Sequence, residues 1–264
     1  MEVTFAILKL VFAFPVIVAF AIGVGAILNL LFDPDPCDQP GFLERQAVPM
    51  GSALLLAMFL FLLAAQFWVP LLIPLDESLS HSHPLRLMRS SVGLVATCLF
   101  LGVLTRRWPK ALPLSFYRRP IMAYAIFLPL LALVAFFNRI LVEDVLGREI
   151  PFELFEGFLE LQGTPLFLAA VLLVIFVPWF EEILFRNYLW GAMVKNPGFG
   201  IVRSLLFTSL AFAVLHPPTV WLPVFCLGFF LGWVRWRSGR LSEAVLLHQL
   251  HNLVVLLLFF PINS

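Results

Sequence analysis

Long runs of apolar residues, separated by short polar segments, dominate the hydrophobic pattern of this chain. A helix needs about 20 consecutive apolar residues to cross a bilayer, and by this measure the pattern predicts eight spans. They cover approximately residues 8–32, 51–74, 89–105, 120–142, 165–190, 199–216, 219–236 and 241–260. The third is short and the sixth is barely long enough. Because the runs are continuous and do not alternate with polar residues, helices are favoured over strands. The predicted fold class is all-α, a polytopic membrane bundle of about eight transmembrane helices.

Composition supports a membrane protein, because 61% of the 264 residues are hydrophobic and only 12% are charged. Average chains carry about 45–50% apolar and about 25% charged residues. The net charge of +1 gives no electrostatic reason to expect a nucleic-acid partner. Cys37, Cys98 and Cys226 show no paired spacing, so neither a disulfide framework nor a zinc ribbon is predicted. We expect a multi-pass integral protein in contact with the lipid bilayer. Since no organelle signal is visible, a prokaryotic plasma (inner) membrane is the expected location.

Basic residues cluster in three of the predicted loops, and these clusters predict the orientation of the bundle. They lie within residues 106–119, 195–203 and 235–240, and successive clusters are separated by two predicted spans. Cytoplasmic loops carry an excess of Lys and Arg, so these loops are predicted to face the cytoplasm. The acidic segment 143–160 and both termini then lie outside. The acidic loop 33–45 falls inside by the same parity, which makes the first two spans the least determined.

One segment outside the predicted spans has helical spacing of its apolar residues. In the stretch F-E-L-F-E-G-F-L-E-L, residues 152–161, the apolar positions recur on one face, with three Glu residues between them. We interpret it as an amphipathic helix on the outer interface, acting either as a plain connector or as a guide for substrate. There is no internal repeat, and residues 1–264 are predicted to form a single transmembrane domain.

The fifth predicted span contains three charged residues, Glu181, Glu182 and Arg186. An ionisable group at membrane depth costs about 2.5–3.5 kcal/mol on insertion scales, so three in one helix require an explanation. Glu182 and Arg186 are four residues apart, share a helix face and are expected to pair. Glu181 points about a quarter-turn away and is left free to act as a general base. The alternative is a helix end at the interface, with its charges reaching out to water.

The later spans add two polar groups to this picture. The sixth ends with Phe212 and His216 one helical turn apart, and the eighth carries His248 and Asn252 on one face of an otherwise apolar helix. Two donors aimed at one point have the geometry that an oxyanion hole needs. The alternatives are polar residues that bridge neighbouring membrane helices and, for His216, a structural histidine at a helix end.

Together, these residues form three motifs in a fixed order. They are E-E-x-x-x-R at Glu181–Arg186, F-x-x-x-H at Phe212–His216 and H-x-x-x-N at His248–Asn252. This arrangement resembles the CAAX protease and bacteriocin-processing family of glutamic intramembrane endopeptidases, which includes the type II CAAX prenyl endopeptidase. The resemblance covers residues 165–256, whereas the N-terminal helices within residues 1–150 have no assigned role.

The resemblance implies catalytic roles for four residues. Glu181 would activate a water molecule, His216 would hold or polarise that water, and His248 and Asn252 would stabilise the tetrahedral oxyanion. The substrate implied is a membrane-associated protein or peptide, cut near a C-terminus in the best-known relatives. The helices within residues 165–260 would form the catalytic core. We therefore expect these four side chains to converge on one wet pocket within the bilayer, although the predicted topology places His216 near the outer end of a short span.

Glu182, Arg186 and Phe212 are implied as supporting residues, and the resemblance implies neither a metal nor another cofactor. Two His and a Glu could also bind zinc, although the sequence has no H-E-x-x-H motif. A zinc-dependent membrane protease therefore remains an alternative. A further alternative is a non-enzymatic scaffold or immunity-type protein of the same fold, because intramembrane charges also mark ion and substrate pathways.

Overall fold

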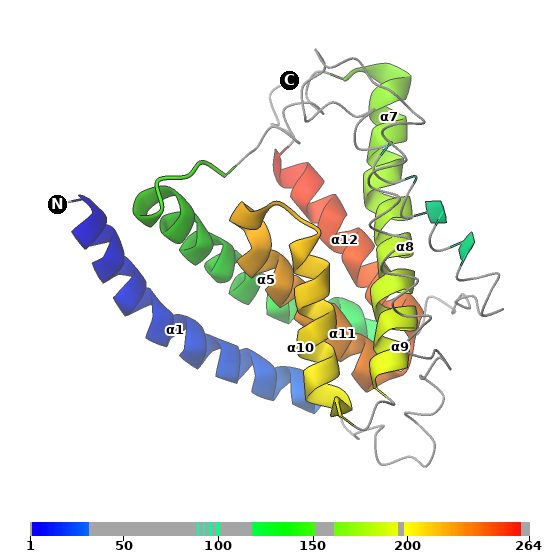
Figure 1. Cartoon of the computed structure of the whole chain (residues 1–264), viewed down its shortest axis with the longest axis horizontal. Helices are drawn as coiled ribbons and strands as arrows, with labels where there is room; N and C mark the ends of the chain where they lie inside the picture. The colour runs from blue at the N-terminus through cyan, green and yellow to red at the C-terminus, as the bar shows by residue number, and fades with distance from the viewer. Residues whose placement is uncertain are drawn as a thin grey trace.

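The computed structural model describes residues 2–31, 89, 92, 95–96, 99–100, 118–150, 161–194 and 198–259. Every regular element within these ranges is a helix (Figure 1). The predicted second span, 51–74, lies outside them. So do most of the predicted third span, 89–105, and all but the last residue of the predicted amphipathic helix, 152–161. These three elements stay predictions.

The described helices fall into six stretches of the chain, some of which contain π-helical or 3-10 segments. They are α1 (Glu2–Leu31); α5 (Arg118–Arg139) with the π-helix η3 (Ile140–Val145); the composite α7 (Gly163–Val171), η4 (Leu172–Phe176), α8 (Val177–Glu182), η5 (Ile183–Leu189) and α9 (Trp190–Met193); α10 (Gly200–Val214); the 3-10 turn η6 (Pro218–Val220) with α11 (Trp221–Ser238); and α12 (Leu241–Phe259).

Five of these stretches are long and apolar enough to cross a membrane, namely Ala13–Leu31, Arg118–Val145, Leu166–Met193, Pro218–Ser238 and Leu241–Leu258. A sixth apolar helix, Gly200–Val214, is shorter. The prediction of a helical membrane bundle is therefore confirmed, and these six stretches match six of the predicted spans in position. The short sixth span was also expected. The total of eight is not confirmed, and the orientation in the membrane stays a prediction.

The third of these candidate spans is not a continuous α-helix, because two π-helical segments, η4 and η5, interrupt it. Pro178 lies two residues after the end of η4, in the first turn of α8. The Val177 N–H bonds to the carbonyl of Leu172, five residues back. Pro178 has no N–H to continue this pattern, so the carbonyl of Leu173 is left available. π-Helical turns are rare and occur frequently at functional sites, and η5 follows Glu181 and Glu182 directly.

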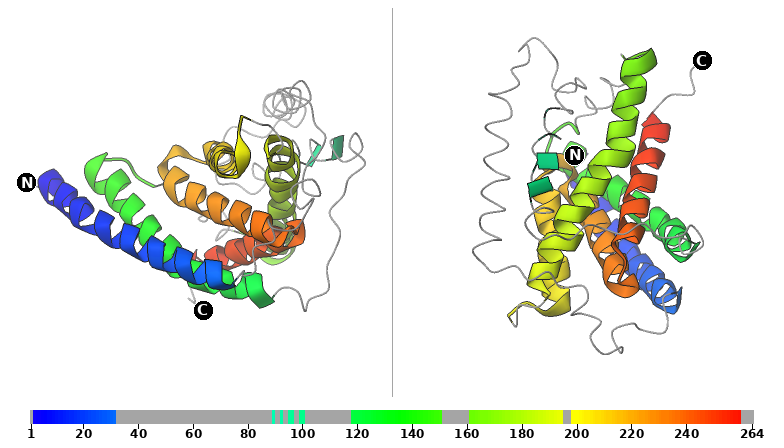
Figure 2. Two further views of the ribbon diagram at one scale, coloured as in Figure 1. Left: turned by 90° about the horizontal axis from the view of Figure 1, so that it is seen from below. Right: turned by 90° about the vertical axis from the view of Figure 1, so that its right-hand side faces the viewer.

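The helices pack around two main apolar clusters. One joins α1, α5, α11 and α12, with Phe127 of α5 stacked on Phe230 of α11 at 4.2 Å between ring centroids. The other joins α8, η5, α9, α10 and α12. Figures 1 and 2 show α1 and α5 side by side on one flank and the α7–α9 stretch on the other, with α11 between them. Because α12 contributes to both clusters, it connects the two flanks.

A glycine in the left-handed backbone conformation forms the turn between α11 and α12. Gly239 caps α11 with φ of 68°, and its N–H bonds to the carbonyl of Arg235. A side chain is disfavoured at this backbone conformation. The turn lets α12 begin two residues later, at Leu241, and pack back along the α7–α9 stretch.

Candidate functional site

Glu182 lies at the centre of the site, fully buried between α8, η5 and α12. Its Oε1 accepts a hydrogen bond from Nδ1 of His248 at 2.9 Å and is 3.0 Å from Nη1 of Arg186. The pairing predicted between Glu182 and Arg186 is therefore present. A buried carboxylate is costly unless it is paired and hydrogen-bonded. Here the cation and the imidazole N–H both lie at Oε1, whereas the buried Oε2 has no hydrogen-bond partner among the described residues.

Arg186 is equally buried, with 1% of its side chain exposed. Its Nη2 donates to the backbone carbonyl of Gly228 at 2.9 Å, and its guanidinium carbon lies 4.5 Å from the centre of the Phe212 ring. Cations over aromatic faces are stabilised further when both groups are desolvated. Arg186 thus connects η5 to α10 and α11 while it neutralises Glu182.

Gly228 makes this close approach possible. A Cβ atom at this position would lie 3.1 Å from a ring carbon of Phe212 and 3.3 Å from Nη2 of Arg186. Both distances are shorter than most contacts that a Cβ atom makes, so a side chain here would require its neighbours to shift. Sequence reasoning missed Gly228. The signal available was a small residue in a membrane helix, which often marks a helix–helix contact.

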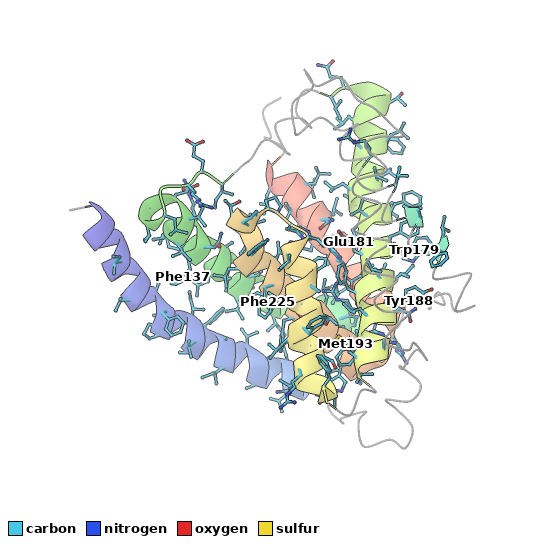
Figure 3. The ribbon with its side chains drawn as sticks, viewed as in Figure 1. Phe137, Trp179, Glu181, Tyr188, Met193 and Phe225 are labelled. Carbon is cyan, nitrogen blue, oxygen red and sulfur yellow. The ribbon has the colours of Figure 1, made fainter. Side chains whose placement is uncertain are left out.

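Glu181 has a different environment from its neighbour. Its side chain is 16% exposed, and its Oε2 lies 3.6 Å from Nε2 of His248. No described residue donates a hydrogen bond to this carboxylate. Glu181 is labelled in Figure 3, where α8 runs beside α12. The two carboxylates therefore differ in environment, since Glu182 is fully buried with Arg186 and His248 at its Oε1, whereas Glu181 is partly exposed and keeps free acceptor positions.

His248 stands between the two carboxylates and faces each with a different ring nitrogen. Since an ionised carboxylate only accepts hydrogen bonds, the contact with Glu182 places a proton on Nδ1. Nε2 is then the nitrogen directed at Glu181. A partner on one ring nitrogen sets what the other can do, so Glu182 determines the tautomer and the orientation of His248.

His216 reaches the same site from the end of α10. Its Nδ1 donates to the carbonyl of Phe212 at 2.9 Å, which leaves Nε2 as the free nitrogen. The Phe212 ring contacts both histidines, with centroid distances of 4.8 Å to His216 and 5.6 Å to His248. The predicted topology places His216 near the outer end of a short span, away from the other site residues. In the structure, one aromatic ring lies between His216 and His248, so this separation is not seen.

Asn252 makes a contact that the sequence did not predict. Its Nδ2 donates to the carbonyl of Leu173 at 2.9 Å, and Gln249 one turn earlier donates to the carbonyl of Ile175 at 3.0 Å. Both acceptors lie in η4, the π-helical segment that precedes Pro178. Among the described residues, no hydrogen bond or ion pair joins Asn252 or His216 directly to Glu181. Convergence of all four residues on one wet pocket stays a prediction.

Two further polar contacts went unnoticed in the sequence. Tyr124 Oη of α5 and Nδ1 of His251 are hydrogen-bonded at 3.1 Å, and Asn138 of α5 donates to the carbonyl of Thr219 at 2.8 Å. Both contacts connect segments far apart in the chain, which no spacing rule reveals. In the described part of the chain, no group of three or more His, Cys, Asp or Glu side chains has an arrangement suited to a metal ion.

Comparison with known proteins agrees with the motif resemblance. Residues 162–254 match the family model described as type II CAAX prenyl endopeptidase Rce1-like, a range that contains all three motifs. A curated relative, the UPF0177 protein YxdF of Lactococcus lactis subsp. lactis (strain IL1403), is 31% identical over 100 residues. The match covers 37% of this chain and 54% of the relative, so the alignment spans about half the length of that protein. No solved structure matches the chain.

Proposed function

We propose that this protein is an intramembrane endopeptidase that hydrolyses a peptide bond in a membrane-associated protein or peptide, near its C-terminus. The observation that carries the proposal is the position of His248, between a buried, ion-paired Glu182 and an available Glu181. The match of residues 162–254 to the prenyl endopeptidase model supports the same reaction class. It also suggests a prenylated C-terminal peptide as the first substrate to test.

Glu181 acts as the general base in this proposal. Its carboxylate removes a proton from a water molecule while the water oxygen bonds to the carbonyl carbon of the scissile peptide. The carbonyl electron pair moves onto the oxygen. When the tetrahedral intermediate collapses, the C–N bond breaks and Glu181 returns the proton to the leaving nitrogen. The free acceptor positions of Glu181 and its partial exposure support this role.

His216 helps to hold the attacking water. Because Nδ1 donates to the carbonyl of Phe212, Nε2 of the neutral ring carries a lone pair that can accept a hydrogen bond from water. The contact of the Phe212 ring with both histidines supports a position of His216 near His248.

His248 and Asn252 supply hydrogen bonds to the oxyanion. With Nδ1 committed to Glu182, His248 donates from Nε2 only as the imidazolium, which carries a proton on both nitrogens. The amide of Asn252 has a second N–H beyond the one that bonds to Leu173. Donors of this kind are most effective when their orientation is fixed before the charge develops. The bond to Glu182 and the bond to η4 provide such fixation.

The decisive experiment compares the wild-type protein with Glu181→Gln. Purified protein in lipid vesicles is given a fluorescence-quenched peptide that ends in a prenylated CAAX sequence, with the unprenylated peptide as the substrate control. Loss of a general base costs roughly 10²- to 10⁴-fold, and we expect a decrease in that range. Glu143→Gln is the matched control, because Glu143 pairs with Arg139 on a partly exposed surface of η3.

Proteomics tests the reaction without assuming the substrate. C-terminal and juxtamembrane peptides from cells with the wild-type protein are compared with those from cells carrying Glu181→Gln, and cleaved ends should appear only in the first. Full cleavage by the variant would contradict the general-base assignment. Metal analysis of the active protein addresses the zinc alternative, since stoichiometric zinc whose removal abolishes cleavage would replace the glutamic mechanism.

A further inference from the structure

An amide on α5 makes a short polar contact with the segment that carries His216. Asn138 is 4% exposed, near the end of an apolar helix that lies outside the family match. Its Nδ2 donates to the backbone carbonyl of Thr219 at 2.8 Å, across 81 residues of sequence. Polar groups buried among membrane helices are costly and commonly functional, so this amide calls for an explanation.

Thr219 lies in the short loop that carries His216. The sequence His216-Pro217-Pro218-Thr219 leads directly from the histidine to the carbonyl that Asn138 binds. Proline fixes φ near −65°, and two successive prolines leave this connection few alternative conformations. A displacement of Thr219 is therefore transmitted to His216.

Local hydrogen bonds make the loop a defined unit. The His216 N–H bonds to the carbonyl of Ala213, and the Val220 N–H bonds to the carbonyl of Pro217. The indole of Trp221 donates to the carbonyl of His216 at 2.8 Å. The bonds to Ala213 and from Trp221 join the loop to the last turn of α10 and the first turn of α11. The bond from Asn138 adds a connection to α5, which these bonds do not supply.

The tie to α5 depends on the Asn138 side chain and not on the side chain of Thr219. The Thr219 hydroxyl is buried and has no hydrogen-bond partner, whereas its carbonyl accepts from Asn138. Without this amide, the carbonyl of Thr219 would lose this donor, and buried backbone carbonyls in native structures are nearly always paired. The loop would then shift until the carbonyl finds another donor.

We propose that Asn138 is a positioning residue for His216. It anchors the His-Pro-Pro-Thr loop to α5 and thereby supports the position of His216, whose ring also bonds through Nδ1 to the carbonyl of Phe212. This inference rests on the proposed function in so far as His216 assists the reaction. It also gives α5, which lies outside the family match, a defined part in the site.

The test measures cleavage of the prenylated peptide by Asn138→Leu, which keeps similar volume and removes the donor. We expect kcat to decrease roughly 10- to 100-fold, as small displacements of reacting groups can cause, with KM within about twofold of wild type. Thr219→Val is the control, because it removes only the unpartnered hydroxyl and keeps the carbonyl bond. Asn138→Ala is the second variant if the leucine variant does not fold.

A double substitution separates positioning from general stability. In a His216→Ala background, Asn138→Leu should cause no further loss of kcat, because the group it positions is already absent. An additive loss would overturn the proposal, since it would show that Asn138 acts independently of His216.

Nuclear magnetic resonance of ¹⁵N-labelled histidine provides a readout that needs no activity. The His216 ring signals, assigned by their loss in His216→Ala, should shift or broaden in Asn138→Leu, while those of His248 keep their wild-type positions. Unchanged His216 signals would overturn the inference. If instead Glu181→Gln cleaves at the wild-type rate, the general-base assignment of the proposed function fails, and the spectra still decide whether Asn138 holds His216.

Discussion

The two halves of this bundle are built on different principles. The cluster joining α1, α5, α11 and α12 is held by ordinary apolar packing, with stacked rings such as Phe127 and Phe230 at its centre. The cluster joining α8, η5, α9, α10 and α12 encloses an ion pair and an imidazole. The ion-pair cluster is sensitive to the loss of a single side chain, because removing one partner leaves the other charge buried and unpaired. The described residues of the apolar cluster include no such pair.

This difference indicates where function resides. The buried Glu182–Arg186 pair lies within one helical stretch, four residues apart, so the pair itself does not join two helices. The pair holds His248 in one orientation, and this orientation is what the proposed reaction uses. Variants that remove a charge from the ion-pair cluster should consequently lower both activity and stability. Variants that remove apolar volume from the other cluster should lower stability alone.

The largest effect is expected for Arg186→Met, which removes the guanidinium and leaves Glu182 buried without its cation. Breaking a buried pair in this way costs about 3–5 kcal/mol, and His248 would lose its fixed acceptor geometry. Both the free energy of unfolding and cleavage should decrease. Denaturant unfolding in mixed micelles, followed by circular dichroism, measures the first quantity.

Arg203→Met is the control for this prediction, because Arg203 is exposed and its one hydrogen bond within the described residues goes to the nearby carbonyl of Gly198. Adding Glu182→Gln to Arg186→Met removes the unpaired charge and should restore part of the lost stability. Equal stability of wild type and Arg186→Met would show that the pair contributes nothing, and the contrast between the two clusters would disappear.

In the apolar cluster, Leu231→Ala is expected to lower stability without lowering activity. Leu231 is fully buried, and truncating a buried leucine costs about 2–5 kcal/mol. Below the unfolding temperature, kcat should stay within about twofold of wild type, because this side chain belongs to the cluster without the ion pair. A large loss of kcat in fully folded protein would mean that the two clusters are not separable.

The sequence revealed which residues form the ion pair, but it did not reveal how the pair is held. The i, i+4 spacing of Glu182 and Arg186 follows from helix geometry alone, and the three motifs identified the helices that bring in the histidines. The partners of these groups belong to other helices. The carbonyl of Gly228 and the ring of Phe212 reach Arg186 only after α10, α11 and η5 have packed together.

Backbone irregularity was equally hidden in the sequence. Pro178 was visible, but a proline in an apolar run does not reveal whether the helix kinks, breaks or widens into a π-turn. The carbonyls of η4 accept hydrogen bonds from side-chain amides of α12. The pairing of these groups depends on how α12 packs against η4. Asn252 was predicted as a free oxyanion donor for this reason, whereas one of its N–H groups bonds to Leu173.

A smaller effect is expected for Gly228→Ala, where a methyl group enters the ion-pair cluster. The new Cβ would meet Phe212 at 3.1 Å and Arg186 at 3.3 Å, and overpacking of this kind costs about 1–3 kcal/mol. Because the displaced groups hold Glu182 and His248, kcat should decrease as well. Gly25→Ala in α1 is the control, since nothing lies within 4 Å of its added Cβ. If both alanine variants behave alike, the close packing at Gly228 has no functional consequence.

The smallest effect is expected for Tyr124→Phe, which removes the hydroxyl that bonds to His251. This contact places a polar pair in the otherwise apolar cluster. Tyr124 belongs to α5, whereas His251 lies on α12, one turn after His248. Loss of one such hydrogen bond costs about 1 kcal/mol, so the midpoint of denaturant unfolding should decrease slightly. If the pair only ties α5 to α12, kcat is unchanged. A decrease in kcat larger than the loss of stability explains would show instead that His251 acts on His248, and the polar cluster would then extend through α12 into the apolar half.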